Sequence, residues 1–114
     1  MSDIQLITFV DLQNASTHCV RIIIEEDRSH LFNATCYHIT GSILTPIQGC
    51  SCTAQVSAVT AFDRVFSSLI TSSFGQQIPK DVIFMFAQGR MLKETQLRSI
   101  LQNVNFNLNQ LITV

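Results

Sequence analysis

The chain has 114 residues, the usual size of one domain, and residues 1–114 are expected to form a single domain. Hydrophobic residues make up 46% and charged residues only 13% of it, which excludes a disordered chain, because disorder needs high charge and low hydrophobicity. The net charge is −1 and the basic residues are scattered, so the basic patch of a nucleic-acid-binding protein is missing and no nucleic-acid partner is expected.

The first half of the chain has the residue pattern of β-strands. Residues 4–12 alternate along the chain, yet both faces carry apolar side chains, which predicts a strand buried on both sides. Residues 18–25 contain three consecutive isoleucines, whose branched Cβ atoms favour a pleated sheet. A short charged link separates them from a third apolar run at 31–39. The two runs are therefore predicted to form a hairpin.

The next segment is divided by Gly and Pro. Apolar residues at 43–47 lie between these breakers, which indicates a short strand or an apolar loop. Residues 50–56 then alternate, with Cys50, Cys52 and Val56 on one face and small polar residues on the other. This pattern predicts a strand with one buried and one solvated face.

The apolar period then changes from two to 3.6, which predicts a helix over residues 58–73. Thr60 followed by Asp63 resembles a capping box, and Ser57 is the alternative N-cap. Gly75 follows the last periodic residue and is suited to the left-handed position that ends many helices.

Three elements are predicted in the remainder. Residues 82–87 are continuously apolar and short, which is typical of a strand inside a sheet. Residues 93–104 have helical spacing, with Thr95 as a possible cap. Alternating asparagines favour a short edge strand over residues 106–114, with a hairpin through 109–110, since Asn is poor in helix interiors.

Strands that precede the helices indicate an α+β fold. The prediction is an antiparallel β-sheet of five to six strands with two α-helices packed on it. This order of strands, helix, strand and helix resembles small intracellular assembly chaperones such as the proteasome-assembling chaperones. The resemblance covers most of the chain, rests on element order rather than on a motif, and implies an assembly role. The strand expected at 106–114 departs from it.

Cysteine and histidine form the one cluster that suggests a metal. Cys36 and His38 share one strand face, as do Cys50 and Cys52, so two neighbouring strands are able to offer zinc four ligands. Structural zinc sites, however, usually space their ligands by two to four residues at turns. We therefore expect buried, reduced cysteines and no cofactor, with a zinc-stabilised binding domain as the alternative function.

Signatures of catalysis are missing from the sequence. It has no Gly-x-Ser-x-Gly elbow and no glycine-rich phosphate loop, so no catalytic or cofactor-binding residue is assigned and a non-enzymatic protein is expected. A cysteine-dependent enzyme is the weakest alternative. The sequence contains no run of about 18 apolar residues, which is the length that a membrane-spanning helix needs. No secretory signal is recognisable at the N-terminus. An intracellular, cytoplasmic protein is therefore expected.

The low charge leads to the functional prediction. So few ionised side chains cannot cover this much apolar chain, so a partner is expected to cover part of it. We predict a protein-interaction or assembly protein that acts as a dimer, through a sheet edge or an apolar face, with a homodimer or a hetero-oligomer as the product. The candidate interface residues are Ile22, Ile24, Leu111, Ile112 and Val114.

Overall fold

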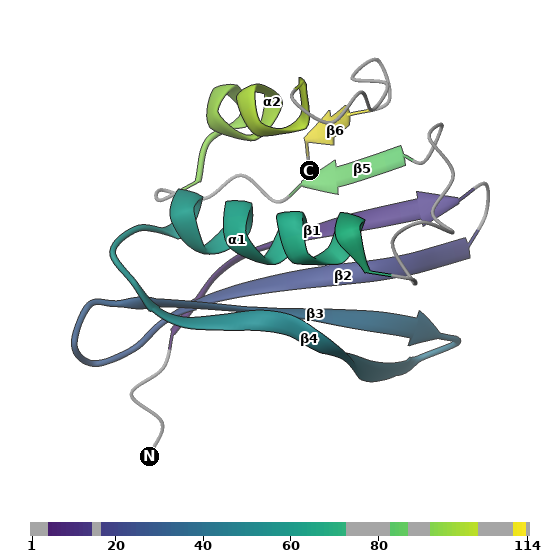
Figure 1. Ribbon diagram of the computed structural model, residues 1–114. Helices are drawn as coiled ribbons and strands as arrows, with labels where there is room; N and C mark the ends of the chain where they lie inside the picture. The colour runs from purple at the N-terminus through teal and green to yellow at the C-terminus, as the bar shows by residue number, and fades with distance from the viewer. Residues whose placement is uncertain (1–4, 15–16, 73–82, 87–91, 103–110, 114) are drawn as a thin grey trace.

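The structure is a computed structural model that describes residues 5–14, 17–72, 83–86, 92–102 and 111–113 (Figure 1). It consists of one sheet with two helices on it, and the α+β class is confirmed. The elements are β1 (Gln5–Asn14), β2 (Thr17–Glu26), β3 (Phe32–Thr40), β4 (Ile43–Gln55), α1 (Ala58–Thr71), β5 (Ile83–Phe86), α2 (Glu94–Gln102) and β6 (Leu111–Thr113).

The strand order in the sheet is β4-β3-β2-β1-β5-β6. Strands β1 to β4 form an antiparallel meander, and β5 pairs antiparallel with the other side of β1. Strand β6 pairs with β5 in parallel, so the expectation of a purely antiparallel sheet is wrong at this edge. The helix α2 lies between β5 and β6 in the chain, and such a crossover is the connection that parallel neighbours require.

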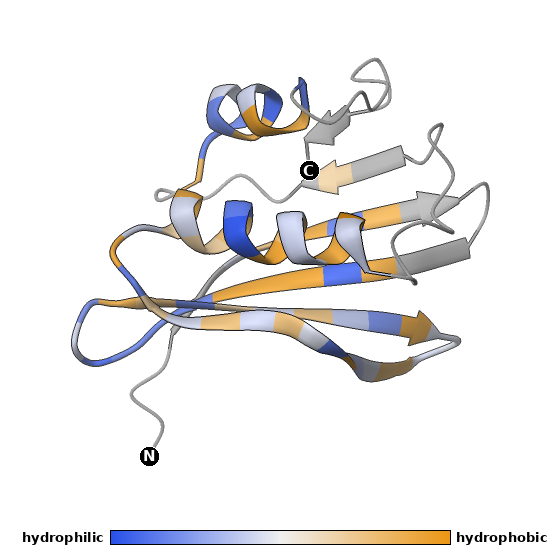
Figure 2. Ribbon diagram, in the orientation of Figure 1, coloured by the Kyte–Doolittle hydropathy of each residue, from blue (hydrophilic) through white to orange (hydrophobic). Residues whose placement is uncertain are grey.

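One core joins both helices to one face of the sheet. The side chains of Val10, Ile22 and Ile24 alternate onto this face, and they belong to the same buried cluster as Phe62 of α1 and Leu97 of α2. Both helices therefore cover the same side of the sheet (Figure 1). Figure 2 shows β2 hydrophobic along most of its coloured length and α1 with both hydrophobic and hydrophilic residues within its turns, as expected for an amphipathic helix.

The start of α1 decides which residue is its N-cap. The N-cap is Ser57, whose Oγ accepts a hydrogen bond from the backbone N–H of Thr60 at 3.1 Å. Thr60 is therefore inside the first turn, and the capping box with Asp63 is wrong. The helix ends at Thr71, where the hydroxyl and the N–H of Ser72 both donate to the carbonyl of Leu69. Gly75, the predicted terminator, lies outside the described residues.

The start of α2 also differs from the prediction. Thr95 is within the helix rather than at its cap. The backbone N–H of Lys93 donates to Oε1 of Gln96 at 2.9 Å, and the carbonyl of Lys93 accepts from the N–H of Leu97. A glutamine that reaches back in this way satisfies a donor at the helix start.

Strand β4 is one long strand, where a short strand or an apolar loop at 43–47 and a separate strand at 50–56 were expected. Its register with β3 shifts twice. Four residues of β4, Ile47 to Cys50, lie opposite Cys36 alone, and two, Thr53 and Ala54, lie opposite Asn33 alone. Gly49 takes a positive φ of 82° and Ala54 one of 58°. These bulges accommodate the Pro and Gly residues that were expected to break the strand. The chain therefore remains in the sheet from Ile43 to Gln55.

Candidate interaction surface

The side of the sheet opposite the helices carries a mixed apolar and polar surface, which we call the open face. Among the described residues, no helix covers it (Figure 1). It is built by the strand positions that alternate with the core. Its residues are Phe9, Asp11, Arg21, Ile23, Glu25, Asn33, Thr35, Tyr37, Ile39 and Met85.

The strand register places these side chains next to one another. Phe9 on β1 lies opposite Ile23 on β2, and Arg21 lies opposite both Asp11 on β1 and Tyr37 on β3. With the exception of buried Asp11, each of these side chains is only partly exposed. The result is a largely apolar area across the middle strands, which the Arg21–Asp11 pair interrupts and beside which Glu25 is partly exposed on β2.

That pair is a bidentate ion pair. Nε of Arg21 donates to one carboxylate oxygen of Asp11 at 2.7 Å, and Nη2 donates to the other at 2.9 Å. The hydrogen bonds that Arg21 donates to Asp11 raise the pKa of the guanidinium above its ordinary value. The guanidinium carbon also lies 4.8 Å from the centroid of the Phe9 ring, within the range of a cation–π contact. The Asp11 side chain is 3% exposed and that of Arg21 is 32% exposed.

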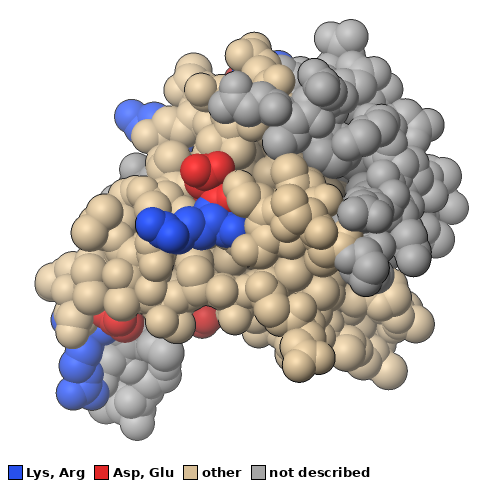
Figure 3. Space-filling model, viewed as in Figure 1, with Lys and Arg blue, Asp and Glu red and all other residues tan. Residues whose placement is uncertain are grey.

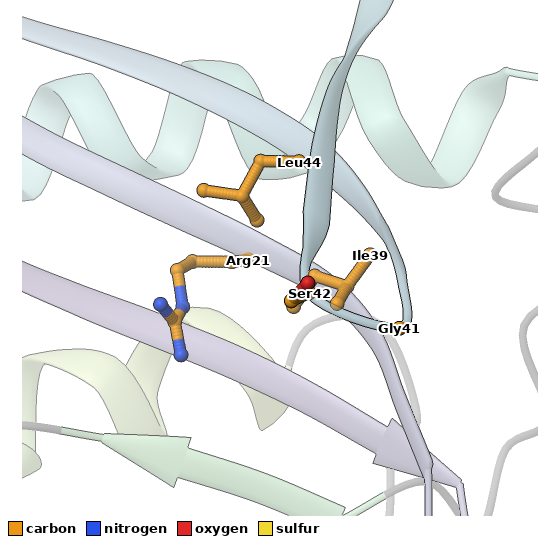
Figure 4. Close-up of a pocket in the computed structure, with 5 residues that line it drawn as sticks. All are labelled: Arg21, Ile39, Gly41, Ser42 and Leu44. Atoms are coloured by element: carbon orange, nitrogen blue, oxygen red, sulfur yellow. The ribbon is translucent and has the colours of Figure 1, made fainter.

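A hollow of about 270 Å³ lies at the margin of the open face, where the β3–β4 hairpin turns. It is lined by Arg21, Ile39, Gly41, Ser42 and Leu44, and Leu44 is directly opposite Ile39 in the strand pairing. Figure 4 shows Leu44 beside the Arg21 side chain and the guanidinium directed toward β1. The hollow is smaller than the cavities of about 300 to 1,000 Å³ that usually hold small molecules.

The four residues of the zinc alternative do not form a site. Within the described part of the chain, no group of three or more His, Cys, Asp or Glu side chains is placed to hold a metal ion. Cys36 and Cys50 are buried in the core, and the Cys52 thiol donates to the carbonyl of Ala61 at 3.4 Å. His38 is partly exposed further along β3. The described structure therefore does not bring these four residues together as the zinc alternative requires.

The same burial bears on cysteine chemistry. Burial raises the pKa of the Cys36 thiol far above its ordinary value, and the neighbouring Cys50 raises it further. Burial also raises the pKa values of Cys50 and Cys52. Because the thiolate is the nucleophile, a raised pKa lowers the fraction of these thiols that can react at neutral pH.

The predicted interface residues fall in different places. Ile22 and Ile24 are both 0% exposed beneath the helices, so their assignment to a surface is wrong. The isoleucine that reaches the open face is Ile23, one position along, because side chains alternate on a strand. Leu111 and Ile112 lie in β6 at the edge of the sheet, and Val114 lies outside the described residues.

Sequence reasoning missed the centre of the open face. The alternation of residues 4–12 places Phe9 and Asp11 on the face away from Val10, but it does not show which face a helix covers. A cross-strand ion pair between Asp11 and Arg21 depends on the register of two strands, and the alternation within each strand does not fix that register.

Charges are sparse on the side of the molecule that the helices cover. Figure 3 shows this side mostly without Lys, Arg, Asp or Glu where residues are described.

Three large apolar side chains in the described part of the chain are exposed, Ile43 at 65%, Leu44 at 39% and Val56 at 80%. Two of the three are at the β3–β4 hairpin, next to the open face.

Comparison with protein-family models, with characterised proteins and with solved structures gives no match. In the described residues there is no helix of the length and hydrophobicity needed to cross a membrane.

Proposed function

We propose that this chain is a non-enzymatic protein-interaction or assembly protein that acts as a dimer through the open face of its sheet. The observation that carries the proposal is the row of partly exposed apolar side chains, Phe9, Ile23, Tyr37, Ile39 and Met85, on a face that no described helix covers. An antiparallel sheet that faces water is normally polar on that side.

The size of the face supports this role. The three long strands of the open face, β1, β2 and β3, are about 4.8 Å apart and about 30 Å long, and they span roughly 430 Å². A standard protein interface buries about 800 Å² on each partner. The open face, extended by β5 and the β3–β4 hairpin, therefore approaches the size of a standard interface.

Charge also favours a second copy as the partner. The charges of Arg21 and Asp11 lie within 2.9 Å of each other, so they neutralise one another within one protomer. Two identical faces can therefore meet without bringing uncompensated charges together at their centre. A strongly acidic or basic partner has no complementary charge to contact there.

The β4 edge of the sheet is a poorer candidate for the interface than the open face. The edge strand β4 contains Pro46, two register slips and the positive φ angles of Gly49 and Ala54. Proline and bulges are the features that prevent an edge from pairing with another strand. Packing of faces is therefore better supported than pairing at the β4 edge.

Sedimentation equilibrium of the purified protein tests the proposal. We expect a reversible dimer in the range of about 10 to 200 µM. Ile23→Glu, which places a charge on the open face, should shift the protein to monomer, and the matched control Val56→Glu should leave the dimer intact. A wild-type chain that is monomeric throughout this range, or an Ile23→Glu variant that dimerises normally, would contradict it.

A further inference from the structure

We infer that Arg21 is the principal anchor of this interface, and that it binds uncharged oxygen acceptors on the face of a second copy. The inference rests on the proposed dimer and adds the residue and the chemistry that fix how two faces recognise each other. It is drawn from the contacts of Arg21, which differ from those of an ordinary surface arginine.

The first observation is that the guanidinium is already held in place. Two contacts to Asp11 and a third to the Phe9 ring fix its plane on the sheet. A free arginine loses much side-chain entropy when it binds, and a preorganised one loses less. Arg21 can therefore contribute hydrogen bonds to a partner at a lower entropic cost than a mobile arginine.

The second observation is position. Arg21 is on β2, with Asp11 on one side and Tyr37 on the other, so it is at the middle of the open face. Its side chain is 32% exposed and also forms one wall of the hollow beneath Leu44. Arginine is among the residue types that dominate binding energy when they lie near the centre of an interface.

The third observation identifies the acceptor. A guanidinium carries more N–H donors than the two that Asp11 engages, but its positive charge is already matched. A carboxylate from the partner would therefore add an excess negative charge, whereas a hydroxyl, amide or backbone oxygen would not. The same face of a second copy offers such oxygens in the hydroxyl groups of Thr35 and Tyr37.

The dissociation constant of the dimer, measured for one variant of Arg21 and one matched control, tests the role of Arg21. Arg21→Lys keeps the charge but loses the planar fork, and it should weaken dimerisation roughly tenfold or more. The control Arg64→Lys, at an exposed position of α1, should change it by less than about twofold. Circular dichroism at each concentration confirms that the variants are folded.

Asp11→Asn provides a readout that a purely structural role would not give. It keeps the shape of residue 11 but leaves Arg21 uncompensated in both copies, so the dimer should weaken at about 50 mM salt and recover in part at about 500 mM, where charges are screened. The wild-type dimer should change little over this range.

The outcomes separate the two proposals. A wild-type dimer whose affinity is the same in Arg21→Lys, or an Asp11→Asn dimer that shows no salt recovery, overturns the role of Arg21 and leaves the dimer standing. A monomeric wild-type chain overturns both. Weakening in Arg21→Lys together with salt recovery in Asp11→Asn supports both.

Discussion

Arg21 and Asp11 lie directly opposite each other on β2 and β1, and both oxygens of the carboxylate accept hydrogen bonds from the guanidinium. The carboxylate is almost entirely buried although no described helix covers it, because the Arg21 side chain and neighbouring strands surround it. The pair thus joins the two central strands and determines the charge of the face on which we place the interface.

The ion pair should contribute to stability in a way that depends on both partners. Asp11→Ala should lower the free energy of unfolding by about 1 to 3 kcal/mol, because it leaves a partly buried guanidinium without its acceptor. Adding Arg21→Met should recover part of that loss, since the unpaired charge is removed. Urea unfolding of the two single variants and the double variant measures the coupling. Costs that simply add would show that the pair does not act as a unit.

The cap of α1 gives a second prediction. Ser57→Ala removes the oxygen that accepts from the N–H of Thr60, and it should cost about 1 kcal/mol of stability. Ser68→Ala, at an exposed position within the same helix, is the control and should be neutral or slightly stabilising, because alanine favours helices. Thermal unfolding of both variants distinguishes them, and equal melting temperatures would argue against Ser57 as the cap.

The aromatic pair in α1 anchors the helix to the sheet. Phe62 and Phe66 are buried, and their rings are stacked with centroids 5.4 Å apart. Phe62→Ala should lower the free energy of unfolding by about 3 to 5 kcal/mol, because it removes a large buried side chain and leaves a cavity. Val56→Ala, at an exposed site, should change it by less than about 0.5 kcal/mol. A small effect of Phe62→Ala in denaturant titration would mean that α1 is not packed as described.

The buried thiols should make stability depend on alkaline pH. The pKa of Cys36 is raised in the folded state, so above the ordinary thiol pKa of about 8.5 the unfolded chain loses a proton that the folded chain keeps. Stability from this group is therefore complete below about pH 8.5 and falls above it, by at most about 1.4 kcal/mol per pH unit for each such thiol.

Unfolding measured from pH 7 to 10 checks this prediction, with Cys36→Ala as the comparison. The variant begins from a lower stability, since a buried side chain is truncated, but its decline with pH should be shallower. Parallel declines in the two proteins would show that Cys36 does not titrate in this way.

Several elements could be predicted because their signals are local. The run of isoleucines in β2, the helical spacing from residue 58 and the continuous apolar run at Ile83–Phe86 each identify an element from its own residues. The caps were harder to predict, since Ser57 and Thr60 are both suitable N-cap residues and the backbone geometry of the first turn chooses between them.

The direction of β6 could not be read from its residues. A segment such as Leu111–Thr113 has the same composition in a parallel or an antiparallel edge, and the crossover through α2 decides between them. The zinc cluster failed for a related reason. Strand spacing put Cys36, Cys50 and Cys52 near the same face, but that face is the core, where thiols pack as small apolar groups.

By itself, the sequence determined that this chain folds as strands with two amphipathic helices. It also indicated that, with so few charged residues, some apolar side chains have to lie at the surface. Only the tertiary structure decided which residues those are. Side chains on a strand point alternately to opposite sides, so the position of the helices over Ile22 and Ile24 buries both and turns Ile23 outward with Arg21. The choice of face depends on long-range packing, which no local pattern contains.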